Sequence, residues 1–264
     1  MATDTATLLE TLKAGIATLR TSDAWQRYLD TQAKFHRYSF SNCMLITMQC
    51  PRATHVAGFH TWREMKRQVR KGEHGIAILA PMLIKTTPTP DLAPDEHNAP
   101  AVVRRFKAVY VFDIAQTDGQ ALPTVGPQTV EGSDNGLLAA LSTYATGQGL
   151  TIAYDAPAPV CGSYDHGRML IRLAPNTKPG DAALTLAHEL THHLLHDPAG
   201  TRRNVEIDET TAESVAYIVA KANGLEPTPS FAYIASYDRD GKALALLGNT
   251  VQRLAATILD AIAA

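Results

Sequence analysis

Two histidines and a glutamate in the second half of the chain have the spacing of a metal-binding motif. The residues His188-Glu189-Leu190-Thr191-His192 lie in a segment, Asp181–His196, whose leucines and alanines recur at helical spacing. Residues four apart on a helix lie one above the other, about 5–6 Å apart, so both imidazoles can reach one ion. Glu189 can then act as general base toward a water molecule at that ion. The motif therefore predicts a catalytic zinc (Zn2+) site.

A catalytic zinc usually has three protein ligands and one position open to water, so a third ligand is expected from a neighbouring element. The next helical segment, about Val205–Asn223, contains Glu209 and Glu213, which are four residues apart and share a face. We expect Glu209 to bind the metal and Glu213 to hold the free N–H of a ligand histidine. The reverse assignment of the two glutamates is the main alternative.

The motif could also be a solvated cluster on a surface helix. The flanking leucines favour a buried helix instead, in which two imidazoles and a carboxylate without partners would cost several kcal/mol. A metal ion would satisfy these groups and stabilise the neighbouring negative charge. The residue that stabilises the oxyanion is left open among Tyr217, Tyr233 and Tyr237.

A second group of residues that could do chemistry lies in the segment 59–71, which is rich in cations and contains Phe59 and Trp62. Its predicted DNA-binding residues are Trp62, Arg63, Lys66, Arg67, Arg70 and Lys71. Cations along a backbone and aromatic rings for the bases are the combination that holds single-stranded nucleic acid. The alternative is a solvated amphipathic helix with Trp62, Met65 and Val69 packed inward.

Composition limits the classes of protein that remain. The chain has 264 residues, of which 45% are hydrophobic and 19% charged, and a formal net charge of −2, which indicates a globular protein of one large or two small domains and excludes disorder. No apolar stretch reaches the roughly 18–20 residues that a bilayer needs, and Met1–Glu10 lacks the pattern of a secretory signal. The three cysteines lack C-x-x-C spacing. We therefore expect a cytoplasmic protein with no membrane partner.

The elements that must position these residues follow from periodicity and turn composition. Strands are expected at Gly75–Leu79, Val109–Phe112 and Leu150–Tyr154, and a hairpin from Val160–Tyr164 and Met169–Leu173. Helices are expected near residues 8–29, 44–48, 137–146, 181–196, 205–223 and 244–262. The segments 86–100 and 116–134 are rich in Pro, Gly and Asp, so we expect an exposed loop and an interdomain linker.

Several of these segments together resemble a known family. The runs 38–42, 56–62, 68–78 and 111–117, which read YSFSN, VAGFHTW, QVRKGEHGIAI and VFDIAQT, resemble the N-terminal domain of ArdC-type antirestriction proteins. The runs 185–196 and 209–213, which read TLAHELTHHLLH and ETTAE, resemble the zincin-like metallopeptidase domain of the same family. The similarity extends from about residue 5 to residue 262.

This resemblance implies an α+β fold in which a small mixed N-terminal domain, residues 1–128, precedes a zincin-like metallopeptidase domain, residues 129–264. It implies that the first domain binds single-stranded DNA and that Glu209 is the third metal ligand. The expected function is a zinc metallopeptidase, acting on a peptide or protein substrate, fused to a DNA-binding module with a role in antirestriction or DNA protection. The alternative is a DNA-binding protein whose metal site is structural or vestigial.

Overall fold

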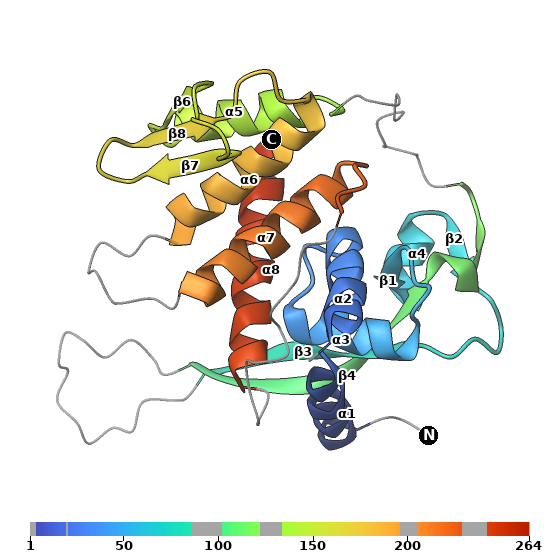
Figure 1. Cartoon of the computed structure of the whole chain (residues 1–264). Coiled ribbons are helices and arrows are strands. Elements are labelled where there is room, and N and C mark those ends of the chain that lie inside the picture. Colours follow the sequence, from blue (N-terminus) through green and yellow to red (C-terminus); the bar gives the residue numbers. More distant parts are fainter. Residues whose placement is uncertain are drawn as a thin grey trace, which may run out of the picture. The chain divides into compact units, whose positions relative to one another are not determined.

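The computed structural model describes residues 4–19, 21–85, 102–121, 134–195, 205–228 and 242–263 (Figure 1). By its contacts, the chain divides into two compact units. The first unit comprises residues 1–15 and 44–120, and the second comprises residues 16–43 and 121–264. The segments 86–101, 122–133, 196–204 and 229–241 lie outside the described residues, and these include Tyr233, Tyr237, the expected loop and most of the expected linker.

The first unit contains two small antiparallel β-structures. A three-stranded sheet has the order β1-β4-β3, and a two-stranded ribbon pairs β2 with β5. Its elements are α1 (Thr5–Thr18, whose last turn enters the second unit), β1 (Val56–Gly58), α4 (Phe59–Glu64), β2 (Arg67–Val69), β3 (Ile76–Lys85), β4 (Val102–Asp113), the short 3-10 helix η1 (Ile114–Gln116) and β5 (Thr117–Gly119). Strands β3 and β4 form a long hairpin, with Ile76 opposite Val111 and Lys85 opposite Val102.

A buried carboxylate organises the turn that joins the sheet to the ribbon. The side chain of Asp113 is almost inaccessible, and its oxygens accept hydrogen bonds from the backbone N–H groups of Thr54, His55 and Ala115 at 2.7, 3.2 and 2.9 Å. Gln116 completes a capping box by accepting from the N–H of Asp113 at 2.9 Å. Because a buried charge needs such partners, Asp113 fixes the start of η1 and the path of the chain into β5.

The second unit is mostly helical. Its helices are α2 (Ser22–Lys34), the first turn of α3 (Phe40–Gln49), α5 (Leu137–Gly147), α6 (Pro179–Leu195), α7 (Val205–Ala222) and α8 (Lys242–Ile262). Helix α6 packs against α5 and α7, and α7 also packs against α2 and α8. Helix α6 buries mainly alanines and leucines and α7 mainly alanines and valines, so burial of these apolar faces stabilises their packing.

A three-stranded sheet lies beside α6. Its order is β6-β8-β7, with β6 (Thr151–Ala153) parallel to β8 (Leu170–Leu173) and β7 (Gly162–Asp165) antiparallel to it. Strand β7 is therefore an edge strand, and it contacts α6 directly (Figure 1). The hairpin expected in this region is confirmed, and each of its strands is one residue shorter than expected.

Helix α2 belongs to the second unit although it lies near the start of the chain. Trp25 and Tyr28 are fully buried there; the Trp25 indole N–H donates to Ser214 Oγ of α7 at 3.0 Å, and the Tyr28 hydroxyl donates to the Gly248 carbonyl of α8 at 3.2 Å. The two compact units therefore differ from the expected domains, 1–128 and 129–264, in the placement of residues 16–43. Residues 16–43 belong to the second unit because Trp25 and Tyr28 pack onto α7 and α8.

The fold otherwise follows the sequence pattern, and the α+β class is confirmed by the helices and sheets of both units. The basic segment 59–71 is the exception, because it forms a short helix and a strand, α4 and β2, where a single amphipathic helix was the structural alternative. Across the described ranges, no helix combines the length and apolar character that a membrane crossing requires.

The Trp25–Ser214 bond should contribute measurably to stability. Trp25→Phe removes the N–H donor, leaves the buried Ser214 hydroxyl without that partner and opens a small cavity, so we expect the free energy of unfolding to fall by about 2 kcal/mol. Chemical denaturation of the wild type, Trp25→Phe, Ser214→Ala and the double variant measures it. The double variant should lose less than the two single losses combined; strictly additive losses would contradict a direct interaction.

Candidate functional site

Helices α6 and α7 bring the three expected metal ligands together. The Nε2 atoms of His188 and His192 lie 3.0 Å apart, and the Glu209 carboxylate oxygens lie 3.4 Å from His188 Nε2 and 3.5 Å from His192 Nε2. Together the ligand atoms of these three residues fall within 4.8 Å of one another. One ion can therefore contact all three. Of the two candidate glutamates on α7, Glu209 has its carboxylate within this distance of both histidines, and Glu213 is not part of the group.

The pKa values of two groups in the cluster are shifted by burial. Burial, together with the neighbouring His192, lowers the pKa of His188, so its imidazole is held in the neutral form that binds a metal. Burial, and then the negative charge of Glu209, raises the pKa of Glu189 to about 7. A carboxylate with a pKa near neutrality can both take and give a proton at physiological pH.

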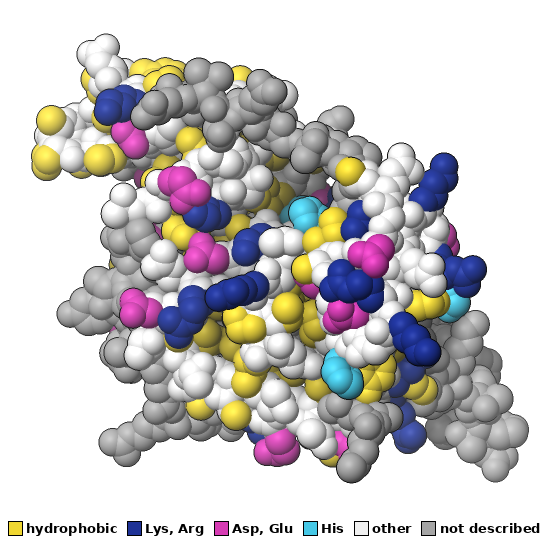
Figure 2. Space-filling view, turned by 90° about the vertical axis from the view of Figure 1, so that its right-hand side faces the viewer, with side chains coloured by type: hydrophobic (Ala, Val, Ile, Leu, Met, Phe, Trp, Pro, Cys, Tyr) yellow, Lys and Arg dark blue, Asp and Glu magenta, His cyan; other side chains and the backbone are white. Residues whose placement is uncertain are grey.

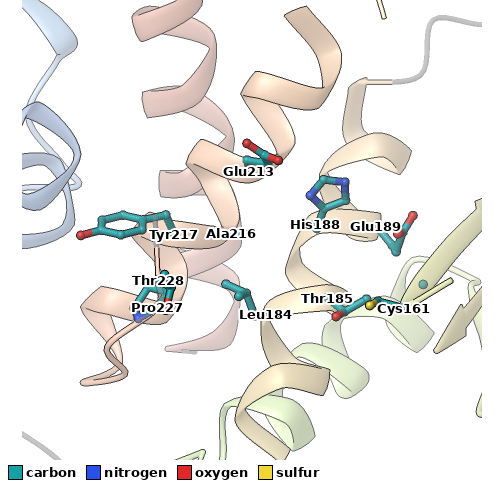
Figure 3. A pocket seen from close by; sticks show the side chains of 11 residues that line it. Cys161, Leu184, Thr185, His188, Glu189, Glu213, Ala216, Tyr217, Pro227 and Thr228 are labelled. Carbon is teal, nitrogen blue, oxygen red and sulfur yellow. The ribbon is translucent and has the colours of Figure 1, made fainter. Parts of the chain in front are cut away.

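A cleft of about 350 Å³ opens beside the cluster (Figure 3). His188, Glu189, Leu184 and Thr185 of α6 line it, and Glu213, Ala216 and Tyr217 of α7 lie across from them; the remaining walls come from Cys161, Gly162, Pro227 and Thr228. The lining is mostly apolar away from the glutamates. The carboxylate of Glu189 thus reaches a cavity of the size that small-molecule and side-chain ligands occupy.

The two other side chains considered for this site are also on α7. Glu213 faces His188 across the cleft in Figure 3. Its expected role, holding the free N–H of a ligand histidine, stays a prediction. The Tyr217 hydroxyl donates to Asp30 Oδ1 at 2.7 Å, and burial together with this bond raises the pKa of Tyr217 to about 12. Its ring points away from His188, which argues against Tyr217 as the group that stabilises an oxyanion.

A second face of α6, which the sequence analysis did not identify as functional, lies against the edge strand β7. A Cβ atom at Gly162 would lie 2.4 Å from Thr185 Cγ2 and 3.0 Å from Glu189 Oε1, so only glycine allows β7 to approach this closely. Two residues along, the Tyr164 hydroxyl lies 2.8 Å from His193 Nδ1. Residues 185, 189 and 193 follow at helical spacing, but only the packing of the strand shows what they face.

The residues predicted to bind DNA fall into three groups in the first unit. Trp62 is buried and its indole N–H donates to the Phe112 carbonyl at 2.9 Å, which corrects its assignment as a base-stacking ring. Arg67 bonds to the oxygens of Thr117, Gly119 and Gln120, and Arg70 to Glu73, Asp118 and the Ala115 carbonyl. The side chains of Arg63, Lys66 and Lys71 are exposed and make no hydrogen bond or ion pair to the described residues.

Comparison with known proteins also divides the chain into two parts, although the first match includes residues 16–43, which belong to the second compact unit. Residues 2–112 match the family model of the N-terminal domain of anti-restriction factor ArdC, and residues 158–257 match the IrrE N-terminal-like domain of peptidase family M78. The first part of the chain is therefore ArdC-like, and the second part is M78-like. The M78 match spans α6 and α7, so the helices that hold the metal cluster belong to a metallopeptidase-like domain.

Two solved structures share the fold of this chain. They are the metal-free and Mn(II)-bound crystal structures of the antirestriction ArdC protein from plasmid R388, each 20% identical, with TM-scores of 0.55 and 0.53; each match covers 84% of this chain, and 84% and 83% of the respective crystal chain. A curated relative, the uncharacterized protein pXO2-81 of Bacillus anthracis, is 24% identical over 263 residues. That match covers 84% of this chain but 44% of the relative, so the chain spans less than half of the relative's length.

The expected metal binding by His188, His192 and Glu209 can be tested by removing one of these ligands. His188→Ala should reduce the bound metal by about tenfold or more, because two remaining ligands rarely hold zinc. Elemental analysis of purified protein, after equilibration with zinc and removal of excess metal, measures the stoichiometry. His166→Ala, which removes an exposed histidine outside the cluster, is the matched control and should retain full occupancy. Equal metal contents in the two variants would contradict the assignment.

The close approach of β7 to α6 gives a separate prediction. Gly162→Ala should lower the free energy of unfolding by about 1–3 kcal/mol, because the added methyl group collides with Thr185. Adding Thr185→Ser removes the colliding Cγ2 and should restore much of the loss. Gly147→Ala, at a position where a Cβ meets nothing within 4 Å, should be neutral or stabilising. A Gly162→Ala protein as stable as the wild type would show that β7 can move away.

Proposed function

We propose that the second unit is a zinc-dependent peptidase and that the first unit binds single-stranded DNA. The observation that carries the enzymatic part is the meeting of His188, His192 and Glu209 around one point, with the Glu189 carboxylate in the adjoining cleft. Two imidazoles and one carboxylate are a ligand set used by catalytic zinc, which keeps a further position open. A purely structural ion would need no base beside it.

The residues fit zinc by their chemistry. Imidazole nitrogen suits zinc, whereas magnesium and calcium prefer oxygen ligands throughout. One of the two R388 ArdC crystal structures is Mn(II)-bound, and this supports a divalent ion as the ligand of His188, His192 and Glu209 here. When bound, such an ion would lower the pKa of a water molecule and polarise a peptide carbonyl.

Glu189 carries the proton transfers in this proposal. Its carboxylate would take a proton from the attacking water and deliver it to the leaving amine, which cannot depart as an anion. Burial keeps its pKa close to neutrality, so both transfers are accessible to the same group. The apolar wall formed by Leu184, Ala216 and Pro227 would receive an uncharged side chain of the peptide substrate.

The DNA-binding part is supported by the match of residues 2–112 to the N-terminal domain of ArdC and by the exposed cations of the first unit. Joined to a peptidase, such a module would direct cleavage to proteins that act on DNA. We therefore propose antirestriction or DNA protection as the biological role. A protein that only coats DNA, with a metal site that is structural or vestigial, is the competing function.

Replacing the general base distinguishes these functions. Glu189→Gln should lower peptide hydrolysis by at least about 100-fold, because the amide cannot accept the proton, while bound metal and DNA affinity remain those of the wild type. A library of fluorogenic peptides, assayed with zinc-loaded protein, measures turnover. Glu10→Gln, which removes an exposed carboxylate from the first unit, is the control. Equal turnover in both variants would exclude this mechanism, and DNA binding without any hydrolysis would favour the coating function.

A further inference from the structure

A second hollow lies in the first unit, between α4 and the β2–β5 ribbon. It has a volume of about 680 Å³ and is lined by Phe59, Arg63, Lys66, Arg67, Gln68, Asp118 and Gly119. We call it the Phe59 groove. Three cationic side chains and one carboxylate line it, which leaves a net positive charge. The side of the molecule that carries α4 and β2 shows Lys and Arg side chains next to hydrophobic ones (Figure 2).

The frame of the groove is built by one arginine and one glycine. The Arg67 guanidinium donates to Thr117 Oγ1 at 2.8 Å and to the carbonyls of Thr117 and Gly119 at 3.0 and 3.3 Å. These bonds join β2 to β5, so Arg67 has a structural role. A Cβ at Gly119 would lie 2.4 Å from the Lys66 carbonyl oxygen, so the two backbones are in direct contact there. These contacts hold the backbones of β2 and β5 together where they line the groove.

Two cations on the wall are left for a ligand. Arg63 and Lys66 are exposed, and neither side chain makes a hydrogen bond or ion pair to the described residues. Lys66 has a φ of 57°, a left-handed conformation that is uncommon for a residue with a Cβ. The contacts of its backbone N–H with the Arg63 carbonyl, at 3.0 Å, and of its carbonyl with the Gln120 N–H, at 3.3 Å, hold it there. An unusual backbone state kept in place at a groove is a feature of functional sites.

An exposed aromatic ring completes the site. Phe59 is 41% exposed, whereas the neighbouring Trp62 is 1% exposed and packed inside. The ring of Phe59 makes edge-to-face contacts with Phe112 and His60, at centroid distances of 6.5 and 5.9 Å, which hold it in a defined orientation. A hydrophobic ring beside two cations without partners matches a ligand that has both a flat π-face and a negative charge.

We propose that the Phe59 groove binds one nucleotide of single-stranded DNA, with the base on Phe59 and the flanking phosphates at Arg63 and Lys66. This inference rests on the proposed DNA-binding function of the first unit and assigns that function to a particular groove. Only an unpaired base exposes a face for stacking, so the groove selects single strands over duplex. Asp118 also lines the groove, but its carboxylate pairs with Arg70 at 3.4 Å, so Arg63 and Lys66 are the charges left to meet the phosphates.

The stacking part is tested with an aromatic that lies elsewhere in the same unit. Phe59→Ala in the full chain should weaken binding of a fluorescent oligothymidine by about 5- to 150-fold, the usual loss for one stacking ring. Phe106→Ala removes a ring that is 50% exposed on β4 and should bind as the wild type does. Phe59→Trp should retain binding, which separates loss of stacking from loss of folding. Fluorescence anisotropy measures each affinity.

The phosphate part is tested by salt dependence. Arg63→Gln/Lys66→Gln should reduce the slope of log affinity against log salt concentration by about 1.4, the value for two phosphates on a single strand. The matched control, Arg105→Gln/Lys107→Gln, removes the same charge from exposed positions on β4 and should leave the slope unchanged. This readout does not depend on the fraction of folded protein, because the slope reports the number of ions released.

The outcomes separate the groove from the function on which it rests. If the wild type binds oligothymidine and neither the Phe59 nor the Arg63/Lys66 variants differ from their controls, the groove is not the site and the DNA-binding function stands. If wild-type binding to duplex of the same length is as tight, stacking on Phe59 is excluded. If the wild type binds neither, the proposed DNA-binding function fails together with the groove.

Discussion

The packing of α6 onto α7 is the constraint on which the metal centre depends. Buried alanines and leucines hold the two helices together, and this apolar contact forces His188, His192 and Glu209 to within 4.8 Å of one another. Burying these polar groups costs free energy unless they have hydrogen-bond or metal partners. Burial accordingly lowers the pKa of His188 and raises the pKa of Glu189, which disfavours the charged form of each. A divalent cation would remove this cost, so metal binding and helix packing should stabilise each other.

In the described part of the first unit, buried charged groups are instead satisfied by hydrogen bonds from the protein itself. Its buried carboxylate, Asp113, is satisfied by three backbone N–H groups, and the guanidinium groups of Arg67 and Arg70 are satisfied by carbonyls and carboxylates of β5 and its neighbours. Asp113, Arg67 and Arg70 therefore have structural roles in the first unit. Arg63 and Lys66, whose side chains take no part in these hydrogen bonds, remain available to a ligand.

The sequence predicted that His188 and His192 come together because the signal for their meeting is local. A spacing of four residues on a helix determines that His188 and His192 share a face, and the second helix offered two candidates for the third ligand. The placement of β7 against Glu189 was not predictable, because Gly162 is 27 positions away and carries no side chain pattern that indicates its neighbour. Trp62 was misassigned for a related reason: an aromatic beside cations reads the same in sequence whether its ring is buried or exposed.

The route of the chain between its two units has a consequence for how the protein can be divided. The backbone enters the second unit at residue 16, leaves it after residue 43 and returns at residue 121. A cut at one position, such as residue 128, would strip Trp25 and Tyr28 from the helices they cover and expose an apolar face of α7 and α8. Isolated halves should aggregate, and recombination of either module with a foreign partner would have to carry α2 across as well.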